Sequence, residues 1–299
     1  MSESRQPIPA KVHLALLFVQ FTFGIFHVVG KGLLGHMHPL ALAGIRVTVA
    51  APLLLALAWA LSHEKPKRSD LPTLAVLGLF GVFINQVLFI TGLSYTTATN
   101  AAILMPAIPV FTAAVAATFR VERMTIFKAL GVAFAVGGAL VMLDVFRFSL
   151  ARETVFGNIL ILLNTLSFSC YLVIQRPILK RLSPVTVVAW AYLFGGAGVL
   201  AVSAPKMIEF VSSGPELWMY AGLAYVVLIP TTIVYVVNAW AVSRSTATLV
   251  ATYTTLQPLA TASFAGLFLG EAVGRREAAG FVLIVAGLMF VSRSRNKES

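Results

Sequence analysis

Apolar segments of membrane-spanning length follow one another along almost the whole chain, separated by short polar or charged connections. A helix needs about 20 apolar residues to cross the hydrocarbon core of a bilayer. Charges, prolines and glycines divide the chain into ten such segments: residues 12–34, 39–62, 70–93, 97–119, 125–145, 156–179, 184–205, 215–242, 246–269 and 275–293. Lipid offers no partner to unpaired backbone groups, so we expect all ten to be helices. The alternating pattern of a membrane β-barrel is absent. The chain is therefore predicted to be an all-α membrane protein with ten transmembrane helices.

The second half of the chain repeats the first. Residues Thr97, Pro109, Glu122, Gly131 and Gly138 return 149 positions later as Thr246, Pro258, Glu271, Gly280 and Gly287. Nearer the start of the two halves, offsets of 144 and 145 both align some residues, and the register stays open there. A duplicated apolar unit predicts two structural repeats, residues 1–148 (spans 1–5) and 149–299 (spans 6–10). Because five is an odd number of spans, the second repeat must enter the membrane upside down, with a central cavity between the two.

Composition supports a membrane protein and suggests its orientation. The chain is 59% hydrophobic and 11% charged, whereas soluble domains carry about 25% charged residues. The net charge of +11 comes from basic residues in short loops, roughly 15 on the side of the two termini against roughly 5 on the other. We therefore expect an integral inner (plasma) membrane protein with both termini cytoplasmic and no bound nucleic acid. Since the first segment leads directly into further spans, we interpret it as a span and not as a cleavable signal peptide.

Several segments carry a family resemblance. They are Phe23-Gly24, Lys31, Pro39-Leu40 and Ile45-Arg46 near the start, residues 109–112 and 120–123 at the end of the fourth span, and residues 269–271 and 286–287 in the second half. Because these segments occur in this order and are duplicated, the chain resembles the drug/metabolite transporter superfamily, specifically its EamA-type ten-helix transporters. Residues 85–99 also resemble plant amino-acid facilitators of that superfamily. One departure is Phe23, which stands where the family usually has tryptophan.

The resemblance implies a fold and an activity. Helices 1, 3, 4, 6, 8 and 9 would surround a central cavity, and helices 5 and 10 would pack at the periphery. Typical substrates of the family are amino acids, other small metabolites and drugs, and the usual direction is export by alternating access.

Two polar stripes predict where a substrate binds. In the first span Gln20, His27 and Lys31 are spaced i, i+7 and i+11, which places them on one helix face. The sixth span repeats this spacing with Asn164, Tyr171 and Gln175. Polar side chains at membrane depth face either a cavity or a hydrogen-bonding helix. We predict that Gln20, His27, Asn164, Tyr171, Tyr235 and Gln257 line one cavity near the middle of the membrane.

Charged residues within the spans are few. Arg46 lies about 12 Å along the second span, where it either binds a substrate carboxylate or holds two helices together. Lys31 either contacts substrate or extends to the membrane surface. His27 is the one group there that titrates near neutral pH. Because no carboxylate lies in the middle of a span, either His27 couples transport to protons or the protein is a facilitator.

Further candidates complete the predicted site. Additional substrate-binding residues are Asn85, Asn100, Asn238 and Tyr253, and the prolines Pro106, Pro109, Pro230 and Pro258 are either hinges or static kinks. For Glu122 and Glu271, at the ends of their spans, helix capping and pairing with Arg123 or Arg275 are favoured over a proton relay. We expect no metal and no cofactor, since His36 and His38 have no nearby acid or thiolate.

The sequence thus predicts a transporter that exports or facilitates the passage of small metabolites, with amino acids the leading class. The alternatives are a nucleotide-sugar or sugar-phosphate exchanger, an intramembrane enzyme and a membrane scaffold. An exchanger would need several cations at the cavity, and no known catalytic motif falls within the spans. The expected partners are the lipid bilayer and a small-molecule substrate, and the protein is either a monomer or a homo-oligomer.

Overall fold

Most of the residues that the structure describes are helical. The computed structural model describes residues 8–96, 98–142, 151–257, 260 and 275–294. Its helices are α1 (Ala10–Leu34), α2 (Pro39–Leu61), η1 (Arg68–Asp70), α3 (Leu71–Gly78), η2 (Leu79–Ile84), α4 (Asn85–Ser94), α5 (Ala98–Leu104), α6 (Ala107–Thr118), α7 (Ile126–Met142), α8 (Arg152–Ile178), α9 (Pro184–Ser212), α10 (Leu217–Val226), η4 (Val227–Ile233), α11 (Val234–Arg244), α12 (Ala247–Tyr253), η5 (Thr254–Leu256) and α14 (Arg275–Ser294). No strand occurs in these ranges, which confirms the predicted all-α class for them.

Five continuous helices are long and apolar enough to cross a membrane. They are Pro39–Leu61, Arg68–Ser94, Thr154–Ile178, Pro184–Ser212 and Leu217–Arg244, and four shorter apolar helices are Ala10–Phe26, Ala107–Thr118, Ile126–Val141 and Ala278–Arg293. Large apolar side chains such as Phe156, Leu163 and Val202 are exposed on the outside of the bundle. An apolar exterior of this kind suits contact with lipid.

Two of the long helices contain a π-helical turn at matching places. One turn, η2, joins α3 to α4, and the other, η4, joins α10 to α11. In η4 the hydroxyls of Thr231 and Thr232 donate to the Val226 and Val227 carbonyls at 2.7 and 2.8 Å. Pro230 lies in the same turn and has no backbone N–H to contribute to the helix ladder. Such turns rotate the helix locally and occur often at functional sites.

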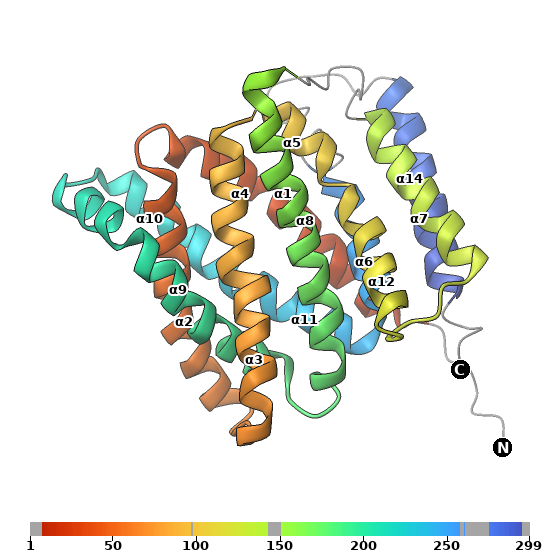
Figure 1. Ribbon diagram of the computed structural model, residues 1–299, viewed down its shortest axis with the longest axis horizontal. Helices are drawn as coiled ribbons and strands as arrows, with labels where there is room; N and C mark the ends of the chain where they lie inside the picture. Colours follow the sequence, from red (N-terminus) through yellow and green to blue (C-terminus); the bar gives the residue numbers. More distant parts are fainter. Residues whose placement is uncertain (1–7, 97, 143–150, 258–259, 261–274, 295–299) are drawn as a thin grey trace.

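Helices α2 and α9 form a close antiparallel pair. Near one end of the pair, the Ser62 and Thr186 hydroxyl oxygens are 2.8 Å apart. Near the other end, Gly44 faces Ser203 and Met207 so closely that an added Cβ would overlap both side chains. Figure 1 shows the two helices side by side.

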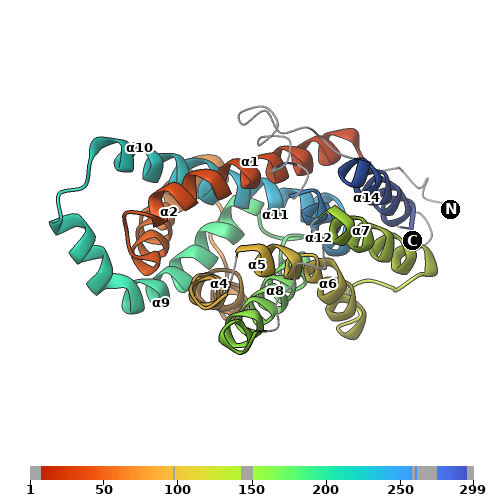
Figure 2. The same ribbon diagram turned by 90° about the horizontal axis from the view of Figure 1, so that it is seen from above.

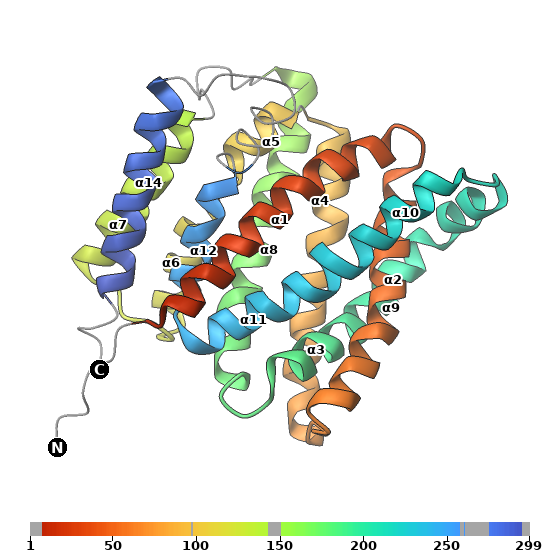
Figure 3. The ribbon, with the colours of Figure 1, turned by 180° about the vertical axis from the view of Figure 1, so that it is seen from behind.

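Helices α7 and α14 form a second close pair at one edge of the molecule, most clearly in Figures 1 and 3. A Cβ added to Gly131 would lie 2.7 Å from the Gly287 carbonyl oxygen, and one added to Gly138 would lie 2.6 Å from the Gly280 carbonyl oxygen. The earlier glycine of α7 meets the later glycine of α14, and the later one meets the earlier one, so the two helices run antiparallel. The edge position agrees with the peripheral place expected for these segments, as seen from above in Figure 2.

Replacing Gly138 with alanine is expected to lower the free energy of unfolding by about 1–3 kcal/mol, because the added methyl group forces two backbones apart. Gly137 is the matched control, since a Cβ there meets nothing within 4 Å. Gly137→Ala should leave stability unchanged or raise it by up to about 1 kcal/mol through helix propensity. Thermal unfolding in detergent measures both variants, and equal melting temperatures would contradict the close packing.

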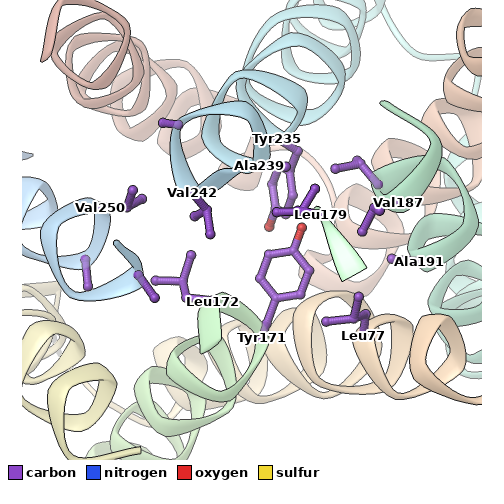
Figure 4. Close-up of a cluster of buried hydrophobic side chains, with 14 of the residues drawn as sticks. Leu77, Tyr171, Leu172, Leu179, Val187, Ala191, Tyr235, Ala239, Val242 and Val250 are labelled. Carbon is purple, nitrogen blue, oxygen red and sulfur yellow. The ribbon is translucent and has the colours of Figure 1, made fainter. Parts of the chain in front are cut away.

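A buried cluster occupies the middle of the bundle, where α3, α8, α9, α11 and α12 meet (Figure 4). Tyr171 of α8 and Tyr235 of α11 point toward one another there, with ring centroids 6.5 Å apart. An added Cβ on Gly81 of η2 would overlap the Tyr171 ring. A residue with a side chain at position 81 would therefore displace this tyrosine.

Candidate functional site

A buried arginine lies at the centre of the bundle. Arg46 of α2 is 5% exposed. Its Nε donates to Thr231 Oγ1 of η4 at 2.9 Å, and its Nη1 donates to Gln86 Oε1 of α4 at 3.4 Å. The guanidinium carbon lies 4.7 Å from the centroid of the Phe26 ring of α1. Side chains from three other elements, α1, α4 and η4, thus converge on one cation.

No carboxylate of the described residues pairs with Arg46. Within that part of the chain, the ion pairs use Lys128 and Arg176 with Glu122, Arg181 with Asp70, and Lys206 with Glu209. A buried charge without a countercharge is costly, because the neutral hydrogen bonds compensate only part of the lost hydration. The site is therefore electrostatically suited to an anionic group.

Tyrosines adjoin this arginine. Gln86 Nε2 donates to the Tyr235 hydroxyl at 3.4 Å. The Tyr235 ring meets the Tyr192 ring edge to face, with centroids 5.2 Å apart. We call the group formed by Arg46, Gln86, Thr231, Tyr171, Tyr192 and Tyr235 the Arg46 centre. It combines a fixed cation with aromatic surface, which suits a small amphipathic molecule with one negative group.

Other predicted residues lie together between α1 and α12. The Gln257 amide donates to Gln20 Oε1 at 3.1 Å, and His13 Nδ1 and the Tyr253 hydroxyl are hydrogen-bonded at 2.6 Å. His13, Gln20 and Tyr253 line a pocket of about 580 Å³ bounded by α1, α12, η5 and α14. The structure thus brings Gln20, Tyr253 and Gln257 together, at a place distinct from the Arg46 centre.

The asparagines bind neighbouring helices. Asn100 Nδ2 and Thr96 Oγ1 both donate to Asn158 Oδ1, at 3.2 and 2.6 Å. Asn164 Nδ2 donates to the backbone carbonyl of Asn85 at 2.7 Å. Asn164 therefore makes the interhelical hydrogen bond that was the alternative to a cavity position.

Two buried amides have polar atoms without a protein partner. Gln175 of α8 is 0% exposed, and both of its amide atoms lack a hydrogen bond to the described residues. Asn238 of α11 is buried too, and its Oδ1 also lacks a hydrogen bond to the described residues. Buried polar atoms are almost always satisfied. Both residues are therefore candidates for contact with substrate or ordered water.

The structure also places the predicted hinges. Pro106 precedes α6 as its N-terminal cap, Pro109 lies in the first turn of α6, and Pro230 lies in η4. The side chains of His27 and Lys31, and the whole of Pro258, lie outside the described residues.

Among the described residues, Glu122 pairs with Lys128 and Arg176 and not, as the sequence predicts, with Arg123. Its carboxylate accepts from the Ala247 N–H at 2.6 Å and from the Thr248 hydroxyl at 2.7 Å, at the start of α12. Lys128 Nζ and Arg176 Nη1 lie 3.3 and 3.5 Å from it. A carboxylate at a helix N-terminus satisfies free N–H groups and interacts favourably with the helix dipole. The capping function was foreseen, but the helix it caps belongs to the other half of the chain.

Sequence reasoning left four contributing residues out of the predicted site: His13, Gln86, Tyr192 and Thr231. Three of them follow patterns already visible in the sequence. His13 lies seven residues before Gln20 and extends the first stripe by two turns. Gln86 lies 149 residues before Tyr235, which is the offset of the repeat. Thr231 lies four and seven residues before Tyr235 and Asn238, on the same helix face. Tyr192 is identified only by its contacts.

Comparison with known proteins gives the family. The sequence model of the EamA-like transporter family matches residues 10–144 and 155–293. The chain belongs to the EamA-like transporter family. This membership and the apolar helices establish a multi-pass membrane protein of a transporter family, which confirms the resemblance seen in the sequence.

Individual relatives are similar along most of their length. The chain is 27% identical to "Protein WALLS ARE THIN 1" of Arabidopsis thaliana, over 98% of the chain and 85% of that protein. It is 28% identical to an uncharacterized transporter of Archaeoglobus fulgidus, over 96% and 99%. It is 30% identical to a probable terminal-alkyne amino-acid exporter of Streptantibioticus cattleyicolor, over 83% and 82%. A solved crystal structure shares the fold with a TM-score of 0.75 at 16% identity, covering 96% of the chain and 98% of its own.

Proposed function

We propose that this EamA-family protein exports or facilitates the passage of amino acids or related amphipathic metabolites by alternating access. The observation that carries the proposal is Arg46, a guanidinium buried at the bundle centre without a carboxylate partner in the described ranges. The substrate carboxylate binds this guanidinium. Thr231 and Gln86 hold the arginine in position, and the tyrosine rings accept the apolar part of the molecule.

The chemistry of arginine supports a carboxylate in particular. A guanidinium donates two parallel hydrogen bonds to one carboxylate, and it keeps its charge when buried. A sugar-phosphate exchanger would need several cations converging on one point, whereas Arg46 is the single cation that the described residues place in this centre. The similarity to a probable amino-acid exporter also favours a carboxylate substrate.

We further propose that the chain crosses the membrane ten times as two inverted repeats, residues 1–148 and 149–299. The helix pair α7 and α14 supports this. Gly131 corresponds to Gly280 and Gly138 to Gly287 at the repeat offset of 149. Gly131 contacts Gly287 while Gly138 contacts Gly280, so exchanging the repeats maps one contact onto the other. Reciprocal contacts between antiparallel helices are what a two-fold axis in the membrane plane would produce.

The Arg46 centre fits the same symmetry. Gln86 and Tyr235 occupy corresponding positions of the two repeats and are hydrogen-bonded to each other. Two equivalent positions meet only where the symmetry axis passes between them, which supports a substrate site at the interface of the proposed repeats. Gln175 and Asn238, which have side-chain amide atoms without a hydrogen bond to the described residues, are proposed to contact substrate along its path.

The protein is proposed to lie in the plasma membrane with both termini cytoplasmic, as the distribution of basic loops predicts. The energy source of transport stays a prediction. Either His27 supplies proton coupling, or passage is facilitated diffusion, since no carboxylate lies in the middle of a predicted span.

Flux into proteoliposomes tests the proposed substrate class. Amino acids should be transported, and analogues with the carboxylate blocked as an amide should compete about 10- to 100-fold less well, because they lose a charge-assisted hydrogen-bonded pair. Analogues with the amine acetylated retain the carboxylate and serve as the matched control. Equal competition by amides and free acids would refute binding of the carboxylate by Arg46. If none of the amino acids tested is transported, amino acids are refuted as the substrate class.

A further inference from the structure

The pocket beside α14 differs in character from the Arg46 centre. Residues of α1, α12, η5 and α14 line it, and Figure 3 shows where helices α1, α12 and α14 lie. We call this pocket the α1/α14 groove. Residues Phe21, Phe281 and Met289 contribute to its lining and are also exposed on the outside of the bundle. In a membrane-spanning bundle, an outward-facing apolar rim of this kind opens toward lipid.

The α1/α14 groove is polar at one end and mostly apolar along the rest, where Gln20 is a polar lining residue. The polar end holds His13, Ser292 and Arg293, and Arg293 lies in the last turn of α14. Apolar side chains such as Leu17 and Val285 line the groove further along the helices. Since His13 lies near the start of α1 and Arg293 near the end of α14, the polar end lies near helix termini, where a membrane surface is expected.

The dimensions of the groove suit one lipid. From Phe281 to Arg293 the wall formed by α14 extends about 18 Å at 1.5 Å per residue. One leaflet of a bilayer with a ~30 Å hydrocarbon core is about 15 Å deep. An acyl chain lying along the groove would therefore end near the middle of the membrane while its phosphate lay at the level of Arg293. The volume of about 580 Å³ is within the ~300–1,000 Å³ range of ligand sites.

We infer that the α1/α14 groove is a binding site for one phospholipid of the surrounding bilayer. The Arg293 guanidinium and the Ser292 hydroxyl bind its phosphate, and Leu17, Val285 and their apolar neighbours bind an acyl chain. Basic residues beside apolar clefts between transmembrane helices bind lipid headgroups in this way. The groove shares no residue with the Arg46 centre, although Gln20 and Tyr253, which the sequence predicted to bind substrate, contribute to its lining.

Native mass spectrometry of the purified full-length protein, titrated with phosphatidylglycerol, tests the inference. The wild-type protein should retain one phosphatidylglycerol molecule. Diacylglycerol with the same chains lacks the phosphate, and glycerol phosphate lacks the chains, so both should compete at least about tenfold less well. Arg293→Gln should weaken retention about tenfold, in line with the loss of one charged hydrogen-bonding partner.

Occlusion variants examine the apolar part of the groove. Val285→Trp fills it from α14 and Leu17→Trp fills it from α1, and each should abolish retention while melting as a folded protein. Leu14→Trp is the matched control, because Leu14 is exposed on α1 and does not line the groove. Arg123→Gln is the control for charge, since Arg123 is exposed and lies outside the groove.

Three results would overturn the inference. They are undiminished retention in both occlusion variants, equal affinity for diacylglycerol and phosphatidylglycerol, and displacement of the lipid by a transported amino acid. The third would assign the groove to the substrate pathway. Arg46→Gln should retain the lipid as the wild type does, so that a failure of the proposed transport function leaves this test unaffected.

Discussion

Replacing Arg46 with glutamine is expected to lower transport about 100-fold without lowering the melting temperature. The substitution removes the cation proposed to bind the substrate carboxylate, and a loss of about 2.8 kcal/mol in binding corresponds to that factor. The folded protein loses a buried charge that has no carboxylate partner in the described part of the chain, which offsets the loss of the hydrogen bonds to Thr231 and Gln86. Thr231 keeps its own hydrogen bond to the Val226 carbonyl.

Flux into proteoliposomes and thermal unfolding, measured on the same preparations, check this expectation. Arg46→Lys keeps the charge but loses the planar pair of donors, so its flux should lie between those of the wild type and the glutamine variant. Arg181→Gln is the control, because Arg181 is a half-exposed partner of Asp70 outside the centre. A marked fall in melting temperature of Arg46→Gln, with normal flux per folded molecule, would show that Arg46 is a clamp between helices.

Glu122→Gln is expected to cause the largest loss of stability, about 3–5 kcal/mol, because it removes the carboxylate that pairs with the buried Lys128 and with Arg176. The Glu122 and Lys128 side chains are each 1% exposed, and they are 3.3 Å apart. The same carboxylate holds the first turn of α12 through Ala247 and Thr248. The change therefore weakens an ion pair and a helix cap together. Unfolding in detergent measures the effect.

A second substitution separates the two contributions. Lys128→Met in the Glu122→Gln background removes the buried cation as well and should recover part of the lost stability, as a double-mutant cycle would reveal. Asp70→Asn is the comparison, since its partner Arg181 is 55% exposed and such pairs contribute about 1 kcal/mol or less. If Glu122→Gln costs no more than Asp70→Asn, the buried pair is not the stabilising element that its geometry indicates.

Much of the helical architecture could be predicted from the sequence, because a membrane imposes length and apolarity on each span separately. The pairing of the helices could not, since those constraints say nothing about neighbours. Arg46 illustrates the difference. Its depth followed from its position in α2, but its hydrogen-bond partners lie 185 and 40 residues away along the chain. The turn η2 was equally hidden, because residues 79–84 contain no proline.

The polar stripes show what helical periodicity can predict about a site and what it cannot. Asn164, Tyr171 and Gln175 share one face of α8, yet they meet different neighbours at different depths. Asn164 binds the α4 backbone, Tyr171 lies against Tyr235, and Gln175 has no protein hydrogen bond among the described residues. A helical repeat predicts which direction a side chain points, but only the packed structure determines what it meets.

The glycine contacts between α7 and α14 also constrain the order of folding during synthesis. Gly131 packs against Gly287 and Val291, which are translated about 150 residues later. At ~5–20 residues per second, this interval lasts on the order of ten seconds or more. Throughout it, the glycine face of α7 lacks the helix that covers it in the finished protein. The first half of the chain therefore cannot complete its own packing, and α14, which is synthesised later, closes this edge of the molecule.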